Sequence, residues 1–267
     1  MIGIVIAAGI GSRMGALTDE RPKCLMPVGN RPLIDWTLDH FRHWRCNPLV
    51  AIVGHCSEAI ERPDLIKIMN TGYRDNNILH SFMHAVDYLD RPVLASYSDI
   101  YVEPPVYEAL MDTPGEIVLA VDVDWRAYYV GRNNHPLGEA ENVYFDARGQ
   151  VHKIGKYLTD NPPPGLRCGE FLGLWRMSGD GAREFRRHID RINLAIGATE
   201  PFQNAREWRK AYITDMVQEL IDQGMVINCA QVERGWAELD TVEDFQRLSE
   251  VAARQRLNGL LEAQRDE

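Results

Sequence analysis

The stretch IAAGIGSRMG, Ile6–Gly15, directly follows the apolar run Ile2–Ile6 at the start of the chain. An apolar run that ends in small residues and glycines predicts a buried strand followed by a tight loop. Because Gly9 and Gly11 carry no side chain, a ligand can approach the N–H groups of this loop closely. The stretch therefore predicts an α/β fold with an anion-binding loop at the end of its first strand.

Short apolar runs alternate with helical patterns through the first half of the chain. The expected strands are Ile2–Ala7, Leu49–Gly54, Leu65–Asn70, Pro92–Ser98 and Glu116–Asp122, and the expected helices are Leu33–Trp44, Ile78–Leu89 and Pro105–Met111. Nearly continuous apolar strands that alternate with helices are typical of a parallel sheet covered on both faces. We predict a doubly wound, Rossmann-like α/β sheet, which binds ligands at the carboxyl ends of its strands.

After Asp122 the pattern becomes rich in short strands and turns. The expected strands are Asn142–Asp146, Val151–Lys156, Cys168–Met177 and Met225–Val232, and helices are expected from Ser178 to about Ile192, over Arg206–Gln223 and from Thr241. We expect a single domain with a mixed sheet. Its first half is residues 1–122, a smaller β-rich insertion covers 123–240, and a C-terminal helix covers 241–267.

The net charge, the apolar runs and the cysteines of the chain argue against several classes of partner and location. The 267 residues carry a net charge of −10, which argues against general binding to nucleic acid or to a membrane surface. No apolar run approaches the roughly 18 residues of a membrane span, and the first run lacks the basic flank of a signal peptide. The five cysteines are odd in number and form no C-x-x-C, so we expect reduced thiols and a cytoplasmic protein.

Two familiar glycine motifs do not fit the opening loop. In a dinucleotide fingerprint the third glycine would come one residue before Gly15, and an acidic residue would end the second strand, where Gly54 and His55 stand. A P-loop needs G-K-[ST], which the loop lacks. A purely structural turn remains open, and so does a solvated surface role for Lys23, which lies between Pro22 and Cys24.

The sequences AAGIGSR (Ala7–Arg13) and RPKCLMPVGNRPLIDW (Arg21–Trp36) together resemble the nucleotidyltransferase superfamily that activates sugar phosphates, phosphocholine and related acceptors. The resemblance implies that Lys23 holds the α-phosphate in the transition state and that Arg13 neutralises phosphate charge beside it. The residues that it places around the nucleotide phosphates are Ala7, Ala8, Gly9, Gly11, Ser12 and Arg13.

Two aspartates match the metal ligands of this superfamily. Asp99 ends the expected strand PVLASYSD, and Asp240 ends GWAELD just before Thr241. Nucleotidyl transfer depends on positioning and charge neutralisation, so the site needs acidic residues for Mg²⁺. The alternatives are a turn aspartate at Asp99 and a helix-capping aspartate at Asp240.

The segment NTGYRDNNILHSFMHA, from Asn70, resembles the cytidylyltransferase branch of the superfamily. Asn77 and Ser81 each donate and accept hydrogen bonds, which suits the edge of a pyrimidine. We therefore expect CTP as the nucleotide, with UTP and dTTP as alternatives.

The segment Trp125–Gly138 contains no acidic residue but carries Arg126, Arg132 and His135. With HKIGK and GEFLGLWRMS, it resembles CTP:phosphoglutamine cytidylyltransferases and the cytidylyltransferases of phosphonate natural-product pathways. A cationic wall is expected to favour an anionic or neutral phosphonate and to reject phosphocholine; surface charge is the alternative for its basic residues. The residues that the resemblance places around the acceptor are Arg126, Arg132, Lys156 and Glu170.

The resemblance implies an enzyme that transfers CMP from CTP to a small phosphonate, such as phosphonoformate or a hydroxyalkylphosphonate, and releases pyrophosphate. It also implies a nucleotide-binding first half, an acceptor-binding second half and a role in antibiotic biosynthesis. A phosphoglutamine or phosphocholine acceptor and a non-catalytic nucleotide-sensing module are the alternatives. The retained Lys23, Asp99 and Asp240 argue against the sensing module. The oligomeric state is not readable from the sequence.

Overall fold

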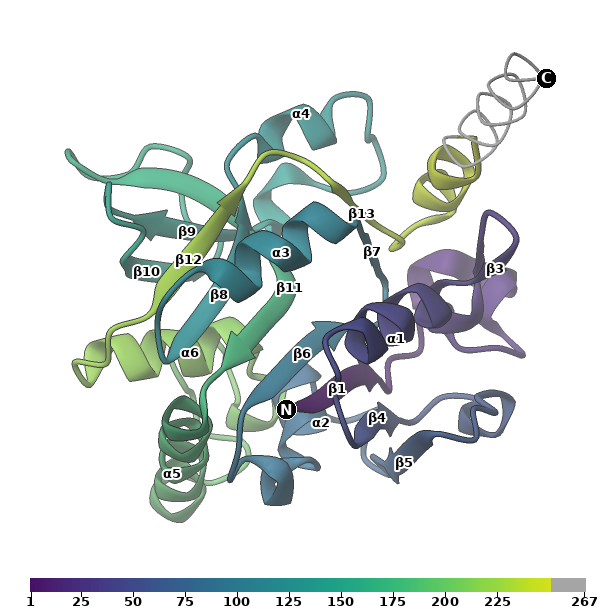
Figure 1. The fold of residues 1–267 in the computed structure, drawn as a ribbon, viewed down its shortest axis with the longest axis horizontal. Coiled ribbons are helices and arrows are strands. Elements are labelled where there is room, and N and C mark those ends of the chain that lie inside the picture. The colour runs from purple at the N-terminus through teal and green to yellow at the C-terminus, as the bar shows by residue number, and fades with distance from the viewer. Residues whose placement is uncertain (251–267) are drawn as a thin grey trace.

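A nine-stranded sheet forms the centre of the computed structural model, which describes residues 1–250 (Figure 1). The mixed α/β fold class predicted from the sequence is confirmed. In chain order the strands of this sheet are β1 (Ile2–Ala7), β4 (Leu49–Val53), β5 (Leu65–Met69), β6 (Val93–Tyr97), β8 (Ile117–Asp122), β9 (Glu141–Phe145), β10 (Val151–Lys156), β11 (Arg167–Met177) and β12 (Asn228–Val232).

The α-helices, several short 3-10 helices and two small ribbons are the other regular elements of the described residues. The helices are α1 (Leu33–His43), α2 (Ile78–Met83), α3 (Pro104–Asp112), α4 (Trp125–Tyr129), α5 (Gly179–Ala195) and α6 (Ile213–Asp222). The ribbons pair β2 (Pro27–Val28) with β3 (Arg31–Pro32), and β7 (Ile100–Val102) with β13 (Trp236–Glu238). Residues 242–250 are also helical, and the rest of the helix expected over 241–267 lies outside the described residues. Among residues 1–250, no helix combines the length and the apolar character that crossing a membrane requires.

The order of the strands shows how the two halves of the chain combine. Strands β5, β4, β1 and β6 are parallel neighbours, as the alternating pattern predicts. Strand β11, from the second half, lies between β6 and β8 and is antiparallel to both. At Gly173 (φ 78°) the strand passes so close to Tyr97 that a Cβ atom would lie 2.2 Å from Cδ2 of that ring. The second half therefore completes the same sheet instead of forming a separate layer.

Some predicted helices differ from those observed. The helix expected from Arg206 begins only at Ile213, because the Asp215 carboxylate accepts the N–H of Tyr212 at 2.7 Å and caps the helix there. The expected cap at Ser178 is present, since its Oγ accepts the N–H of Gly181 at 3.0 Å. Helix α4 and the β7–β13 ribbon are not among the predicted elements, because each is too short for a periodic pattern.

The β7–β13 ribbon brings two distant parts of the chain together. Ile100, directly after Asp99, is paired with Glu238, and the N–H of Leu239 donates to the carbonyl oxygen of Asp99 at 2.7 Å. Asp240 therefore emerges beside Asp99, at the edge where β1 and β6 end. This pairing places the predicted metal ligands of the two halves next to each other.

Candidate active site

The glycine loop folds back so that Lys23 lies beside it. Gly11 takes a left-handed conformation (φ 70°), and its carbonyl oxygen accepts bonds from the Met14 N–H at 2.9 Å and the Thr18 hydroxyl at 3.0 Å. A Cβ atom at Gly11 would lie 3.4 Å from Cε of Lys23, which is a tight contact. A glycine here therefore serves both the turn and the close approach of the lysine.

Lys23 joins the two aspartates. Its Nζ lies 2.9 Å from Oδ2 of Asp99 and 2.8 Å from Oδ1 of Asp240. Burial alone would lower the pKa of Lys23, but the two carboxylates outweigh that effect and raise it, so the amine remains protonated. These three residues, predicted separately from the sequence, form one charged cluster.

Asp240 contacts further basic groups. Arg13 donates to its second oxygen and also to Glu139 at 2.7 Å, and Nδ1 of His135 lies 3.3 Å from that second oxygen. Burial would raise the pKa of Asp240, but the close contact with His135 and the charge of Lys23 hold it well below its usual range. Asp240 is therefore an ionised carboxylate in a basic surrounding.

A cavity of about 150 Å³ lies on the glycine-loop side of Lys23. We call it the nucleotide cavity. Ser12, which was expected to line it, is exposed and is not among its lining residues. The expected residues that do line it are Ala7, Ala8, Gly9, Gly11, Lys23, Asn77, Ser81 and Asp99.

Asn70, which the sequence reasoning missed, organises one wall of this cavity. Its buried side chain exchanges hydrogen bonds with the amide of Asn76 at 2.9 and 3.0 Å, and it donates to Oγ of Ser81 at 3.0 Å. The Asn77 amide instead donates to the carbonyl oxygen of Lys210 at 3.0 Å, which leaves its oxygen to accept a bond. The run of amide residues from Asn70 to Asn77 was the available signal for this network.

A second cavity, of about 280 Å³, meets the nucleotide cavity at Asn77 and Asp99. We call it the acceptor cavity. Its basic lining residues are Arg13, Lys156 and His135. Its acidic lining residues are Asp99, Glu139, Glu141, Glu170, Glu238 and Asp240.

The expected cationic wall does not line the acceptor cavity. Arg126 is more than half exposed and pairs with Asp160 at 2.6 Å, outside the cavity. The side chain of Arg132 is fully buried between Asp244 and Glu238, because two carboxylates compensate its charge. Neither arginine is therefore placed to contact an acceptor here, whereas Lys156 and Glu170 are.

Two glutamates in this cavity have raised pKa values. Burial raises the pKa of Glu170 to about 8, although the Tyr129 hydroxyl donates to its Oε1 at 2.6 Å. The other oxygen, Oε2, is buried and has no hydrogen-bond partner among the described residues. Burial likewise raises the pKa of Glu141 to about 7, against the opposing charge of Lys156. Glu141 was missed because strand alternation alone does not show which polar side chains enter a cavity.

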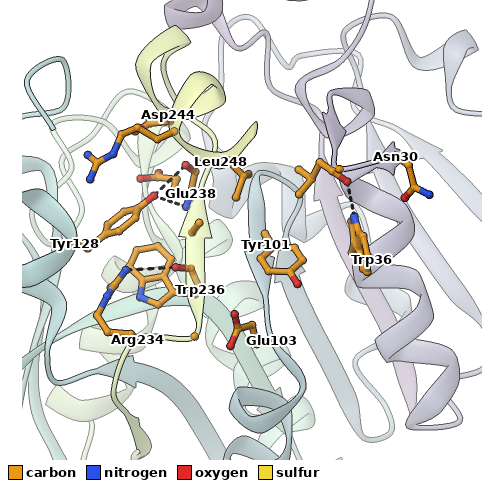
Figure 2. A pocket seen from close by; sticks show the side chains of 15 residues that line it. Asn30, Trp36, Tyr101, Glu103, Tyr128, Arg234, Trp236, Glu238, Asp244 and Leu248 are labelled. Atoms are coloured by element: carbon orange, nitrogen blue, oxygen red, sulfur yellow. Dashed lines mark hydrogen bonds between the residues drawn. The ribbon is translucent and has the colours of Figure 1, made fainter. Parts of the chain in front are cut away.

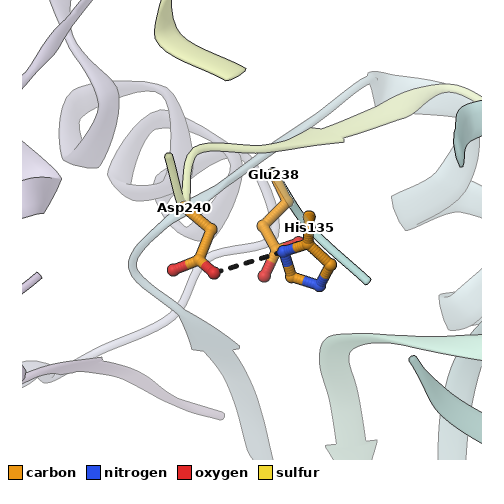
Figure 3. Close-up of side chains that lie close together, drawn as sticks. All are labelled: His135, Glu238 and Asp240. Atoms are coloured by element: carbon orange, nitrogen blue, oxygen red, sulfur yellow. Dashed lines mark ion pairs between the residues drawn. The ribbon is translucent and has the colours of Figure 1, made fainter. Parts of the chain in front are cut away.

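His135, Glu238 and Asp240 also lie close together, and Figure 3 shows their side chains converging. Each offers one ligand atom, and these atoms lie within 4.8 Å of one another. The carboxylates of Asp99 and Asp240 already hold a cation, the Lys23 amine, between them. Both arrangements include Asp240, and carboxylate oxygens are the ligands that Mg²⁺ prefers. The residues present therefore fit the divalent ion that the superfamily uses.

A larger cavity, of about 570 Å³, borders the other side of β13 (Figure 2). Its wall is rich in aromatic rings, with Trp36, Tyr101, Tyr128 and Trp236 drawn in Figure 2. The glycine loop, Lys23 and Asp99 do not contribute to it. Size alone therefore does not identify the reaction site in this molecule.

The profile of the MobA-like NTP transferase domain matches residues 3–160. The chain belongs to this family. It is a nucleotidyltransferase, and the superfamily expected from the glycine loop and Lys23 is confirmed.

Several curated relatives of this chain are named as cytidylyltransferases or CMP-transferring enzymes. CTP:phosphoglutamine cytidylyltransferase of Campylobacter jejuni is 23% identical and is matched over 92% of this chain and 98% of its own length. Choline-phosphate cytidylyltransferase of Streptococcus pneumoniae is 31% identical over 94% and 98%. CMP-5'-(3-aminopropyl)phosphonate synthase of Streptomyces rubellomurinus is 34% identical over 42% of this chain, but the match spans only 19% of that protein. These relatives support cytidylyl transfer to a phosphate-bearing acceptor.

Solved structures show the same fold. CTP:phosphocholine cytidylyltransferase from Streptococcus pneumoniae superposes with a TM-score of 0.70 at 20% identity, covering 94% of this chain and 98% of that one. The inositol-1-phosphate CTP transferase of T. maritima superposes with a TM-score of 0.68 at 16% identity, covering 92% and 94%.

Proposed function

We propose that the enzyme transfers CMP from CTP to a small phosphonate or phosphate that carries a primary ammonium group, with Mg²⁺ and with release of pyrophosphate. The observation that carries this proposal is the buried Glu170 carboxyl, whose Oε2 has no partner among residues 1–250 and which lines the acceptor cavity. That cavity meets the nucleotide cavity at Asp99, within 3 Å of Lys23.

The charge of the acceptor cavity favours a cationic ligand. Six carboxylate residues line it against Arg13, Lys156 and His135. Carboxylates that share a cavity raise each other's pKa, and a bound cation relieves their repulsion. An acceptor with an ammonium group supplies that cation, whereas phosphonoformate would add negative charge. The structure thus favours the opposite acceptor charge from the one the arginines of Trp125–Gly138 suggested.

A primary ammonium fits better than a quaternary one. A buried carboxylate oxygen without a partner is costly, and a primary ammonium offers three N–H donors to satisfy it. A trimethylammonium group offers none and relies on aromatic faces instead. An aminoalkylphosphonate is therefore our first candidate. The name of the Streptomyces relative includes an aminopropylphosphonate, which agrees with this choice and with a phosphonate pathway.

Each residue of the site has a proposed role in the transfer. The loop N–H groups from Ala8 to Gly11 hold the triphosphate, Lys23 and Arg13 stabilise charge that develops at the α-phosphate, and Asn77 and Ser81 contact the cytosine. Asp99 and Asp240 would hold the divalent ion, which supplies charge neutralisation when bound. Lys156 would hold the acceptor's phosphonate, whose oxygen is already an anionic nucleophile and needs no strong protein base.

Phosphoglutamine is the second candidate acceptor, because the match to the Campylobacter enzyme covers almost the whole of both chains. The test measures pyrophosphate release with CTP and Mg²⁺ across 2-aminoethylphosphonate, 3-aminopropylphosphonate, hydroxyethylphosphonate, phosphonoformate, phosphoglutamine and phosphocholine. We expect the highest kcat/KM for an aminoalkylphosphonate. A preference for hydroxyethylphosphonate or phosphonoformate would overturn the ammonium assignment. Absence of pyrophosphate release with every acceptor would argue for a nucleotide sensor.

A further inference from the structure

Arg132 is connected to the predicted metal ligand Asp240 through one intermediate side chain. Its guanidinium donates to both carboxylate oxygens of Asp244, at 2.6 and 2.9 Å, and to Glu238 at 2.8 Å. The side chains of Arg132 and Asp244 are almost completely buried, so solvent screens this pair little.

Asp244 in turn fixes the backbone that carries Asp240. Its Oδ2 accepts the N–H of Asp240 at 3.2 Å, the N–H of Thr241 at 2.8 Å and the Thr241 hydroxyl at 2.9 Å. This is the turn between β13 and the following helix. The bonds orient the turn from which the Asp240 carboxylate reaches Lys23, whose Nζ donates to its Oδ1 at 2.8 Å.

Residues close to Arg132 in the sequence also contact the residues on either side of Asp240. The Tyr128 hydroxyl donates to the carbonyl oxygen of Glu238 at 3.1 Å, and the N–H groups of Asn133 and Asn134 each donate to Glu243 at 2.9 Å. The segment therefore contacts the chain on both sides of Asp240. This explains why a basic segment that resembled an acceptor wall has its central arginine buried.

We propose that Arg132 is a positioning residue that holds Asp240 in place through Asp244 and thereby sets the affinity for the divalent ion. The inference rests on the proposed function, because it takes Asp240 as a metal ligand. Partners that orient metal ligands typically contribute about 10- to 100-fold to metal affinity. Loss of Arg132 should therefore affect metal binding and leave acceptor binding almost unchanged.

The test measures Mn²⁺ binding by electron paramagnetic resonance of free Mn²⁺, in the presence of a non-hydrolysable CTP analogue. The variants are R132K, which keeps the charge but loses the fork geometry, and R132M/D244N, which avoids leaving the buried Asp244 charged without its arginine. R62K is the matched control, because Arg62 makes a similar two-bond pair with Asp35, at 2.6 and 2.9 Å, and neither residue lines the nucleotide or the acceptor cavity. Circular dichroism checks that each variant folds.

We expect Mn²⁺ affinity to fall about tenfold or more in R132M/D244N, less in R132K, and not at all in R62K. At saturating metal, the acceptor KM should stay within about twofold of wild type, well below the cost of a lost charged contact. Unchanged Mn²⁺ affinity in the double variant, or a raised acceptor KM at saturating metal, overturns the inference. A wild-type protein that binds Mn²⁺ and the analogue but turns over no acceptor contradicts the proposed function instead.

Discussion

The nucleotide cavity and the acceptor cavity are built in different ways. The nucleotide cavity is lined mainly by two short stretches, the loop Ala7–Gly11 and the run from Tyr73 to Ser81, with Lys23 and Asp99 beside them. The acceptor cavity takes its lining from scattered positions between Arg13 and Asp240. Local motifs therefore describe the first cavity, whereas long-range packing determines the second.

The two cavities also differ in charge. Lys23 and Asp99 are the basic and acidic residues that line the nucleotide cavity, and main-chain N–H groups and small residues make up much of the rest. The acceptor cavity holds six carboxylate residues. One side thus suits phosphates and the other a cation, and Lys23, Asp99 and Asp240 lie where they meet.

Asp99→Asn and Asp240→Asn should have the largest effect, because they remove the carboxylate charge on which both sides depend. An amide keeps the shape but cannot supply the charge that a divalent ion needs. We expect kcat to fall by about 10²-fold or more in each variant, as on removal of a main electrostatic contact. Steady-state pyrophosphate release at several Mg²⁺ concentrations measures the loss.

Asp64→Asn is the matched control for these variants, since Asp64 is exposed and pairs with Arg42 at the surface. It should retain wild-type turnover. Near-normal kcat in Asp99→Asn or Asp240→Asn at saturating Mg²⁺ would show that the substituted aspartate is not a ligand.

Lys23→Met should have a somewhat smaller effect and should act on kcat more than on the KM for CTP. The protonated amine lies between the cavities, and its role is assigned to charge that develops in the transition state. We expect kcat to fall by about 10²-fold, with the KM for CTP within several-fold of wild type. Weaker CTP binding at unchanged kcat would mean that Lys23 stabilises bound CTP and not the transition state, which contradicts its proposed role.

The contrast between the cavities also explains what the sequence could reveal. The glycine loop and Asp99 follow the ends of β1 and β6, where a parallel sheet gathers its ligand residues, so their position is predictable, whereas the role of Lys23 came from the resemblance. Asp240 was identified by resemblance, and only the β7–β13 ribbon shows why it lies beside Asp99. Arg132 was misplaced because no pattern within one segment reveals that Asp244, 112 residues later, compensates its charge.

Glu170→Gln should act on the acceptor alone. We expect the KM for an aminoalkylphosphonate to rise about 10- to 100-fold, the cost of a lost charged hydrogen bond, with an unchanged KM for CTP. Because burial raises the pKa of Glu170 to about 8, the wild-type carboxyl is increasingly neutral below pH 8. The wild-type acceptor KM should therefore rise as the pH falls from 8 to 6, by at most about tenfold per unit.

The Glu170→Gln variant should lose this part of the pH dependence, and any slope that remains reports the titration of the acceptor itself. Kinetics of both proteins at matched pH values measure the difference. An identical pH profile in the two proteins would remove Glu170 from the ammonium site.

Arg126→Ala should have the smallest effect and tests where the acceptor cavity ends. Arg126 is exposed and pairs with Asp160, and an exposed pair of this kind contributes little. We expect the acceptor KM to stay within about twofold of wild type.

Lys156→Met is its comparison, because Lys156 lines the cavity and its Nζ lies 4.5 Å from the centre of the Tyr212 ring. There the acceptor KM should rise about tenfold or more, since a charged contact to the phosphonate is lost. A tenfold rise in Arg126→Ala would instead mean that the segment around Arg126 folds over the bound acceptor, which would restore the cationic wall that the sequence suggested.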